Sequence, residues 1–461
     1  MERFSDLDAM CLAADTPRQP MHILATLVLD SSNARPDVQG YEVFQQRLFE
    51  RFATVEPLRR RVAEPTFGRP AWRDDDRIHV PQHLHHLVLP DGGGIEALAA
   101  AAGDIASHSL AKDRPLWEAW LVEGFEKDRI AVIVKIHHSA IDGVSGIFAL
   151  AGFYDLEPFP KEPPHFIPWE PRPEPGFGER TWALLDRARR RPTDLARAFG
   201  GFTNSALGLA MGRSRETPLP GTASRQSWNR ALTPNRSVAF TAAPLADVKE
   251  IASTLGSSVN DVLVAICAGV LRQYVMRRGD PPTRPMIAAI PVSEREAEHG
   301  PAGNHFSMMF YSVPVDVASP EGRLEAASRS AKSAKELYSK SGRGLLSNMA
   351  TLAPTAAVGP LVRTASRAKL ANFVPPMFNL VISNIHGPDL PLYVAGSELL
   401  SIFPMGPLVE GVGLSITMMS YRDELAIGFM SCTEHEVELE ELTDEVPLEV
   451  ARLLDASSRI Q

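Results

Sequence analysis

The sequence has few cysteines and no long hydrophobic run, and both absences argue against whole classes of protein. Its 461 residues include three cysteines, Cys11, Cys267 and Cys432, which lie far apart and form no Cys-x-x-Cys pair. This spacing argues against a disulfide scaffold and against a cysteine-based zinc or redox site, so we expect reduced core thiols in a cytoplasmic protein. No apolar run approaches the roughly 20 residues of a bilayer span, and acidic residues stand where a signal peptide needs apolar ones. Any membrane contact is therefore expected to be peripheral.

Acidic side chains outnumber basic ones over the whole chain, but one long segment is rich in Arg. The net charge of −9 argues against a nucleic-acid partner, because such binding depends on many Lys and Arg side chains that neutralise phosphates. Residues 171–230, in contrast, contain eleven Arg, no Lys and five acidic residues. Two interpretations stay open for this Arg-rich segment. It is either an interdomain linker with a solvated Arg face or an amphipathic element that binds a lipid surface.

Hydrophobic periodicity predicts an α+β protein with two large domains. In the first half we expect strands at 22–29, 117–125 and 130–136, and helices at 42–53 and 95–107. In the second half we expect helices at 245–255 and 259–278, the latter capped by Ser257 or Ser258 and ended by Gly279. Strands are expected there at 286–292, 308–317, 378–383 and 399–403, followed by a hairpin of 412–420 and 425–432. The predicted domains are 1–165, an Arg-rich helical linker at 166–232, and 233–461.

Two adjacent histidines end the apolar run 130–136, and Asp142 and Gly143 follow them closely. Neighbouring residues of a strand point to opposite faces, so His137 and His138 cannot both face one pocket. A histidine has a pKa near neutrality and can accept a proton at working pH. The pattern therefore predicts one working base, with Gly143 in a tight turn.

Other interpretations of the histidines are weaker. A buried histidine is often a hydrogen-bonded core residue with no catalytic role. Neither a His-Glu-x-x-His motif nor a nearby cluster of ligands completes a zinc site. A Ser-His-Asp hydrolase needs Gly-x-Ser-x-Gly, and the stretch 143–147 lacks the last glycine.

His-His-x-x-x-Asp-Gly after an apolar strand resembles the signature of the CoA-dependent acyltransferase superfamily, which includes chloramphenicol acetyltransferase and peptide-synthetase condensation domains. The chain is more narrowly similar to the bacterial wax ester synthase/diacylglycerol acyltransferase family. Further marks of that family stand in order along nearly the whole chain: Leu7-Asp8-Ala9, Pro20-Met21-His22, Arg114-Pro115-Leu116-Trp117-Glu118, Val259-Asn260-Asp261-Val262, Pro291-Val292-Ser293 with Arg295, Gly303-Asn304, Ser383-Asn384 and Gly387-Pro388. Cys11, His305 and His386 depart from the usual pattern of that family.

The resemblance implies two chloramphenicol acetyltransferase-like domains with mixed sheets and an active-site channel at their interface. It implies His138 as the general base and His137 in support. Asp142 is expected to be structural and to pair with Arg295. Candidate substrate-binding residues are Pro115, Leu116, Trp117, Asn260, Asp261, Ser383 and Asn384. Each of them has a structural alternative, such as strand entry for Pro115 to Trp117 or helix capping for Asn260 and Asp261.

The resemblance also implies a reaction and its partners. An acyl group would pass from acyl-CoA to diacylglycerol or a long-chain alcohol, with no resident cofactor and no metal. Asn260 is the candidate donor to the oxyanion. Contact with the inner face of the membrane or with lipid droplets would be peripheral and on the cytoplasmic side. Another hydroxyl or amine acceptor, or a non-catalytic lipid-droplet coat, remains an alternative.

Overall fold

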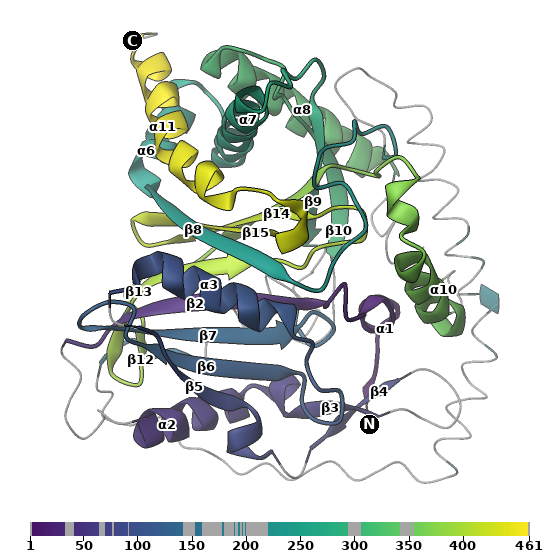
Figure 1. Cartoon of the computed structure of the whole chain (residues 1–461), viewed down its shortest axis with the longest axis vertical. Coiled ribbons are helices and arrows are strands. Elements are labelled where there is room, and N and C mark those ends of the chain that lie inside the picture. The colour runs from purple at the N-terminus through teal and green to yellow at the C-terminus, as the bar shows by residue number, and fades with distance from the viewer. Residues whose placement is uncertain are drawn as a thin grey trace.

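The computed structural model describes residues 2–32, 41–63, 70–75, 78–90, 92–141, 153–158, 220–293, 306–341 and 355–459, with a few single positions between 178 and 351. These residues form two six-stranded mixed sheets and one three-stranded sheet. Figure 1 shows the two large sheets stacked, with helices on their outer faces and one helix between them. The predicted α+β class with mixed sheets is confirmed.

The first large sheet has the strand order β12-β13-β2-β7-β6-β5, and only the β5–β6 pair is parallel. Helix α2 covers one side of this sheet and α3 the other (Figure 1). The predicted strands and helices of the first half are confirmed. The bounds are β2 His22–Asp30, β5 Leu84–Val88, β6 Trp117–Glu123, β7 Arg129–His137, β12 Tyr393–Val394, β13 Ser397–Met405, α2 Tyr41–Thr54 and α3 Gly94–Ser107.

The second large sheet has the order β10-β9-β11-β14-β15-β8, in which β11 runs parallel to both of its neighbours. Helices α6, α7, α8 and α11 cover its outer face (Figure 1). The bounds are β8 Arg236–Pro244, β9 Met286–Ser293, β10 Phe306–Val313, β11 Leu380–His386, β14 Leu414–Tyr421, β15 Glu424–Cys432, α6 Leu245–Thr254, α7 Val259–Arg277, α8 Pro320–Ser341 and α11 Leu439–Ser458.

Most predicted elements of this second half are confirmed, including the β14–β15 hairpin. Strand β10 ends at Val313, four residues earlier than predicted, because Pro314 has no N–H to continue the ladder. The analysis of the sequence did not predict β8, α8 or α11.

The small sheet and the remaining helices lie at the edges. The sheet has the order β1-β4-β3, and its bounds are β1 Glu2–Arg3, β3 Arg60–Ala63 and β4 Ala71–Asp74. Helix α1 (Asp6–Ala14) begins at a capping box of Ser5 and Asp8, and α10 (Thr355–Arg367) packs beside it. Short 3₁₀ turns occur at Glu56–Arg59, Val80–Gln82, Leu370–Asn372 (η4) and Thr433–His435. Apart from a few single residues, positions 166–219 of the predicted linker lie outside the described residues.

Two strands from the C-terminal half of the chain complete the first sheet. Strand β13 pairs with β2 over almost its whole length, with Glu398 opposite Asp30 and Met405 opposite Leu24. Strand β12 adds the edge beyond β13. The predicted domain at 233–461 therefore contributes two strands to the sheet of the predicted domain at 1–165. Sequence periodicity cannot show such a partner, because it reports the faces of a strand and not its neighbours.

Close backbone contacts join the two sheets. A Cβ atom at Gly428 of β15 would stand 2.3 Å from the Pro404 carbonyl oxygen of β13, so only glycine permits this approach. Nearby, the rings of Phe240 and Phe403 stack with centroids 4.7 Å apart. At a second contact, between α3 and β8, a Cβ at Gly103 would stand 2.8 Å from the Arg236 carbonyl oxygen. The two halves are thus packed as tightly as one core.

Helix α7 is the central helix of the second half. As predicted, Ser258 caps it, and Gly279 follows its end with φ +72°. Among the described residues it is the one helix long and apolar enough to cross a membrane, but 72% of the relevant window is buried inside the protein. Core packing accounts for that composition.

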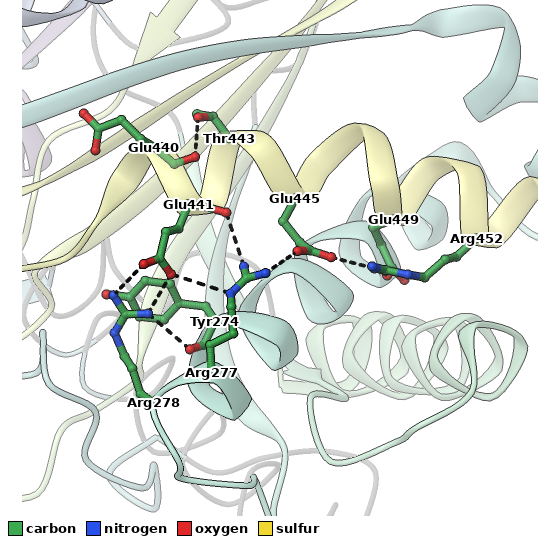
Figure 2. Close-up of polar contacts among 9 residues, drawn as sticks. All are labelled: Tyr274, Arg277, Arg278, Glu440, Glu441, Thr443, Glu445, Glu449 and Arg452. Carbon is green, nitrogen blue, oxygen red and sulfur yellow. Dashed lines mark hydrogen bonds and ion pairs between the residues drawn. The ribbon is translucent and has the colours of Figure 1, made fainter.

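Ion pairs fix α11 against α7, as Figure 2 shows. The Arg277 Nη1 lies 2.7 Å from Glu445 Oε2, and Arg452 Nη1 reaches both Glu445 (2.7 Å) and Glu449 (2.9 Å). Glu449 is fully buried and also pairs with Arg323 of α8. Because buried carboxylates need such partners, this network holds α7 in one position.

All three cysteines are buried and unpaired, as expected of core thiols. Burial raises the pKa of Cys11 and of Cys267 to about 12. Their thiols stay protonated and pack as small apolar groups.

Candidate functional site

The two histidines at the end of β7 have different surroundings. His137 is buried, and its Nδ1 accepts a hydrogen bond from the Ser139 backbone N–H (3.1 Å) while lying 2.7 Å from Ser139 Oγ. The neighbouring His138 is half-buried, and its ring centroid lies 5.3 Å from that of Phe306 in β10 of the second sheet. Only His138 faces the other half of the protein. This geometry agrees with the alternation expected along a strand.

Asp15, at the end of α1, is the centre of the polar contacts around both histidines. Its Oδ1 accepts a hydrogen bond from the Met21 N–H (3.0 Å), and the Met21 carbonyl accepts one from the His138 N–H (2.7 Å). Its Oδ2 lies 2.8 Å from Lys112 Nζ and 3.8 Å from His137 Nε2. One carboxylate therefore orients the His137 ring and the backbone of His138.

Electrostatics set the charge states of two groups beside the histidines, Asp15 and His22. Burial by itself raises the pKa of Asp15, but contacts with His137 and Lys112 outweigh it and hold the pKa well below the usual range. Burial, reinforced by the charge of Lys135, lowers the pKa of His22 to about 3. His22 stands opposite His137 in the sheet and donates from Nε2 to the Ala106 carbonyl (2.9 Å). The carboxylate is thus ionised, and the neighbouring imidazole of His22 is neutral.

The Asn-Asp and Ser-Asn motifs meet at the N-terminus of α7. Asn384, in β11, donates from Nδ2 to Asn260 Oδ1 at 2.7 Å, so the amide N–H₂ of Asn260 remains to donate elsewhere. Asn260 is exposed, whereas Asp261 is buried and completes a capping box with Ser258. Asp261 thus has the helix-capping position that the sequence left open, and Asn260 is the exposed member of the pair.

Residues 115–117 lie in the core of the first sheet. Trp117 is 1% exposed, donates from Nε1 to the Leu58 carbonyl (2.8 Å) and stacks on Phe52 and His83. Leu116 is also buried, and its carbonyl accepts the His137 N–H (2.9 Å). The geometry favours the packing role of Pro115, Leu116 and Trp117 over contact with substrate. The Leu116 carbonyl nevertheless holds the strand end that carries the histidines.

The other candidate residues are placed only in part. Ser383 is half-buried in β11, opposite Thr417 of β14. Asp142, Gly143 and Arg295 lie outside the described residues, so the Asp142–Arg295 pair stays a prediction. Across the described part of the chain, no three His, Cys, Asp or Glu side chains are grouped so as to hold a metal ion.

Sequence reasoning missed Asp15, Lys112 and Phe306. Asp15 stands in the turn Asp15-Thr16-Pro17, five residues before the Pro20-Met21-His22 motif. The motif Pro20-Met21-His22 was the available sign that this turn belongs to the site, because the Met21 carbonyl accepts the hydrogen bond of the His138 N–H. No local pattern links position 15 to position 137, since only the sheet brings them together.

Comparisons with known proteins give the same picture along the chain. Residues 4–263 match the family described as the wax ester synthase/diacylglycerol acyltransferase catalytic domain, and residues 302–453 match the C-terminal domain of the same family. Two putative diacylglycerol O-acyltransferases of Mycobacterium tuberculosis strain H37Rv are similar to this chain. One is 32% identical over 471 residues, covering 99% of this chain and 91% of that protein. The other is 33% identical over 443 residues, covering 94% and 91%.

Solved structures share the fold. The wax ester synthase/diacylglycerol acyltransferase from Marinobacter aquaeolei VT8 superposes with a TM-score of 0.71 at 24% identity, covering 99% of this chain and 100% of that chain. The first condensation domain of the calcium-dependent antibiotic synthetase superposes with a TM-score of 0.57 at 17% identity, covering 99% and 96%. The predicted arrangement of two chloramphenicol acetyltransferase-like domains is therefore confirmed.

Proposed function

Since the chain belongs to the wax ester synthase/diacylglycerol acyltransferase family, we propose that it transfers a long-chain acyl group from acyl-CoA to diacylglycerol, to a long-chain alcohol, or to both. Membership makes the chain an O-acyltransferase. The acceptor, the acyl donor and the catalytic base are the proposed part. The observation that carries the choice of base is the difference in surroundings between His138, at the junction of the halves, and His137, buried against Asp15 and Ser139.

In the proposed reaction, His138 accepts the proton of the acceptor hydroxyl as its oxygen attacks the thioester carbonyl. The tetrahedral intermediate then loses the CoA thiolate as the C–S bond breaks. The imidazolium returns the proton to the thiolate sulfur, so the products are an ester and CoA thiol. No covalent intermediate on the protein and no resident cofactor enters these steps.

Asn260 is the proposed donor to the negatively charged oxygen of the intermediate. Its Oδ1 already accepts from Asn384, which leaves the Nδ2 hydrogens to donate. Donors held in place before the reaction stabilise developing charge without reorganising. Asn384 acts on the reaction only through the orientation of Asn260.

The proposal includes peripheral contact with the cytoplasmic face of the membrane or with lipid droplets, because both proposed acceptors are insoluble in water. It is tested by supplying the purified chain with radiolabelled long-chain acyl-CoA and either diacylglycerol, a long-chain alcohol or a long-chain amine. We expect triacylglycerol, wax ester or both, formed about 10²–10⁴-fold more slowly by His138→Ala.

Product with the amine alone would favour the alternative acceptor class. Failure to acylate any acceptor, by a folded protein, would refute the proposal and favour the lipid-droplet coat.

A further inference from the structure

Exposed apolar side chains gather on α10 and the turn that follows it. Eleven large hydrophobic residues are exposed among the described residues, and five of them fall within 361–377. They are Leu361 (69% exposed), Leu370 (48%), Phe373 (80%), Val374 (52%) and Met377 (56%). The other six are spread over the rest of the chain. A cluster of this kind, unlike single exposed residues, marks an interaction surface.

The same segment is basic within an acidic protein. Arg363, Arg367 and Lys369 are exposed among these apolar residues. No Asp or Glu occurs from Leu337 to Pro388, although acids make up about one residue in eight of the chain. We call Leu361, Arg363, Arg367, Lys369, Leu370, Phe373, Val374 and Met377 the 361–377 surface.

Hydrogen bonds to the rest of the protein hold the backbone beneath this surface in place. Its side chains are therefore exposed from a fixed turn. Arg225 donates to the carbonyls of Ala371 (3.0 Å) and Val374, and Asn372 Oδ1 accepts from the Ala231 N–H (2.7 Å). Lys369 turns the chain in the left-handed region with φ +51°. Polar contacts fix the turn while its apolar side chains point to solvent.

We propose that the 361–377 surface docks the protein on an anionic phospholipid surface. Apolar side chains insert at the boundary of headgroups and acyl chains, and the flanking cations bind the phosphate-bearing headgroups. A protein partner with an acidic apolar face, or a second copy of this chain, would compete for the same surface. The copy is disfavoured because it would place cation against cation.

The location of the surface suits an enzyme with insoluble substrates, a point that rests on the proposed function. Helix α10 lies at the outer edge of the molecule beside α1 (Figure 1). Arg18, in the turn after α1, donates to the Ser366 carbonyl of α10 (2.9 Å). The same turn carries Asp15 and Met21, which contact the two histidines. Docking through α10 therefore brings the lipid surface next to the segment that supports His138.

The test is co-sedimentation of the full-length chain with phosphatidylcholine vesicles, with or without phosphatidylglycerol. One variant removes apolar groups (Leu361→Ser, Phe373→Ser, Met377→Ser), and another removes charge (Arg363→Gln, Arg367→Gln, Lys369→Gln). We expect binding to the anionic vesicles to fall about tenfold or more in each variant. The matched control carries Val88→Ser, Met276→Ser and Leu448→Ser, which are also exposed large hydrophobic residues but are scattered over the chain, and it should bind like the parent.

Three results would overturn the proposal. The first is vesicle binding by both variants at the level of the parent. The second is loss of binding only when Arg187, Arg189, Arg190 and Arg191 are replaced by Gln, which would assign docking to the Arg-rich segment. The third is light scattering that shows the variants dissociating an oligomer while their vesicle binding is unchanged. Acylation of a short, water-soluble alcohol should be normal in both variants, so failure of the proposed reaction is recognised separately from failure of docking.

Discussion

Strands β7 and β11 each lie inside a mixed sheet and each carry a polar residue pair, one at the end of β7 and one within β11, but the chemistry of the two pairs differs. Strand β7 ends at His137, which lies beside the carboxylate of Asp15, itself paired with Lys112, and His138 follows directly. Strand β11 carries Ser383 and Asn384, and the partner of Asn384 is the neutral amide of Asn260. In the proposed reaction, the first half supplies the groups that exchange protons, and the second half supplies neutral donors. An active site between them can combine proton transfer with stabilisation of a developing charge.

The largest effect should come from removing the base at the end of β7. His138→Ala is expected to lower kcat by about 10²–10⁴-fold without loss of fold, because proton transfer by a positioned side chain contributes that factor. His137→Ala is the matched control, one residue away. It should retain more activity and lose about 1–3 kcal/mol of stability, since it leaves the buried Ser139 and Asp15 groups with one partner fewer. Steady-state rates and urea unfolding of both variants decide, and an essential His137 beside a dispensable His138 would reverse the assignment.

The polar pair of β11 should affect the reaction through Asn260. Asn260→Ala is expected to lower kcat by about 10²–10³-fold, with KM little changed, as for loss of an oxyanion donor. Asn384→Ala should have a smaller effect in the same direction, because it removes only the orientation of Asn260. The double variant should be no worse than Asn260→Ala alone. If the effects of the two single substitutions on the single-turnover rate instead multiply in the double variant, Asn384 has a role of its own.

The junction between the halves can be broken at one glycine. Gly428→Ala places a Cβ 2.3 Å from the Pro404 carbonyl, so β13 and β15 must separate. We expect a loss of about 1–3 kcal/mol in unfolding free energy, as for overpacking. Gly178→Ala serves as control, since a Cβ there meets no heavy atom within 4 Å. Equal stability of the two variants in urea unfolding would show that the junction is not tightly packed.

The charge at the end of β7 should appear as pH-dependent stability. The pKa of Asp15 is depressed in the folded state, so its contribution is complete above the unfolded value of about 3.9 and is lost as pH falls further. Asp15→Asn is expected to cost about 1–3 kcal/mol from pH 7 down to about 5, with the difference from the parent shrinking below about pH 4. Asp444→Asn, on the exposed side of α11, should show no such trend. Urea unfolding at several pH values measures both, and a pH-independent difference would contradict the ionised state of Asp15.

Local patterns predicted the elements that depend on local physics. The cap at Ser258, the stop at Gly279 and the β14–β15 hairpin follow from side-chain capping, backbone freedom and alternation. The opposite directions of His137 and His138 follow from the same alternation. The family motifs identified candidate site residues along the chain, but they gave Trp117 a binding role that its burial does not favour.

What the sequence could not predict depends on residues that are distant along the chain. Strand β13 lies in the first sheet because its edge and apolar face fit β2, some 370 residues earlier in the chain. Asp15 reaches His137 only after β2 has paired with β7.

By itself, the sequence determined the α+β class, most individual elements and the histidine motif, because neighbouring residues impose those features on one another. The tertiary structure alone decided which polar groups surround each histidine, that Asn384 orients Asn260, and that the apolar residues of the 361–377 surface stay exposed. Those outcomes depend on which surfaces remain uncovered after packing, and no single stretch of the chain determines how distant segments pack.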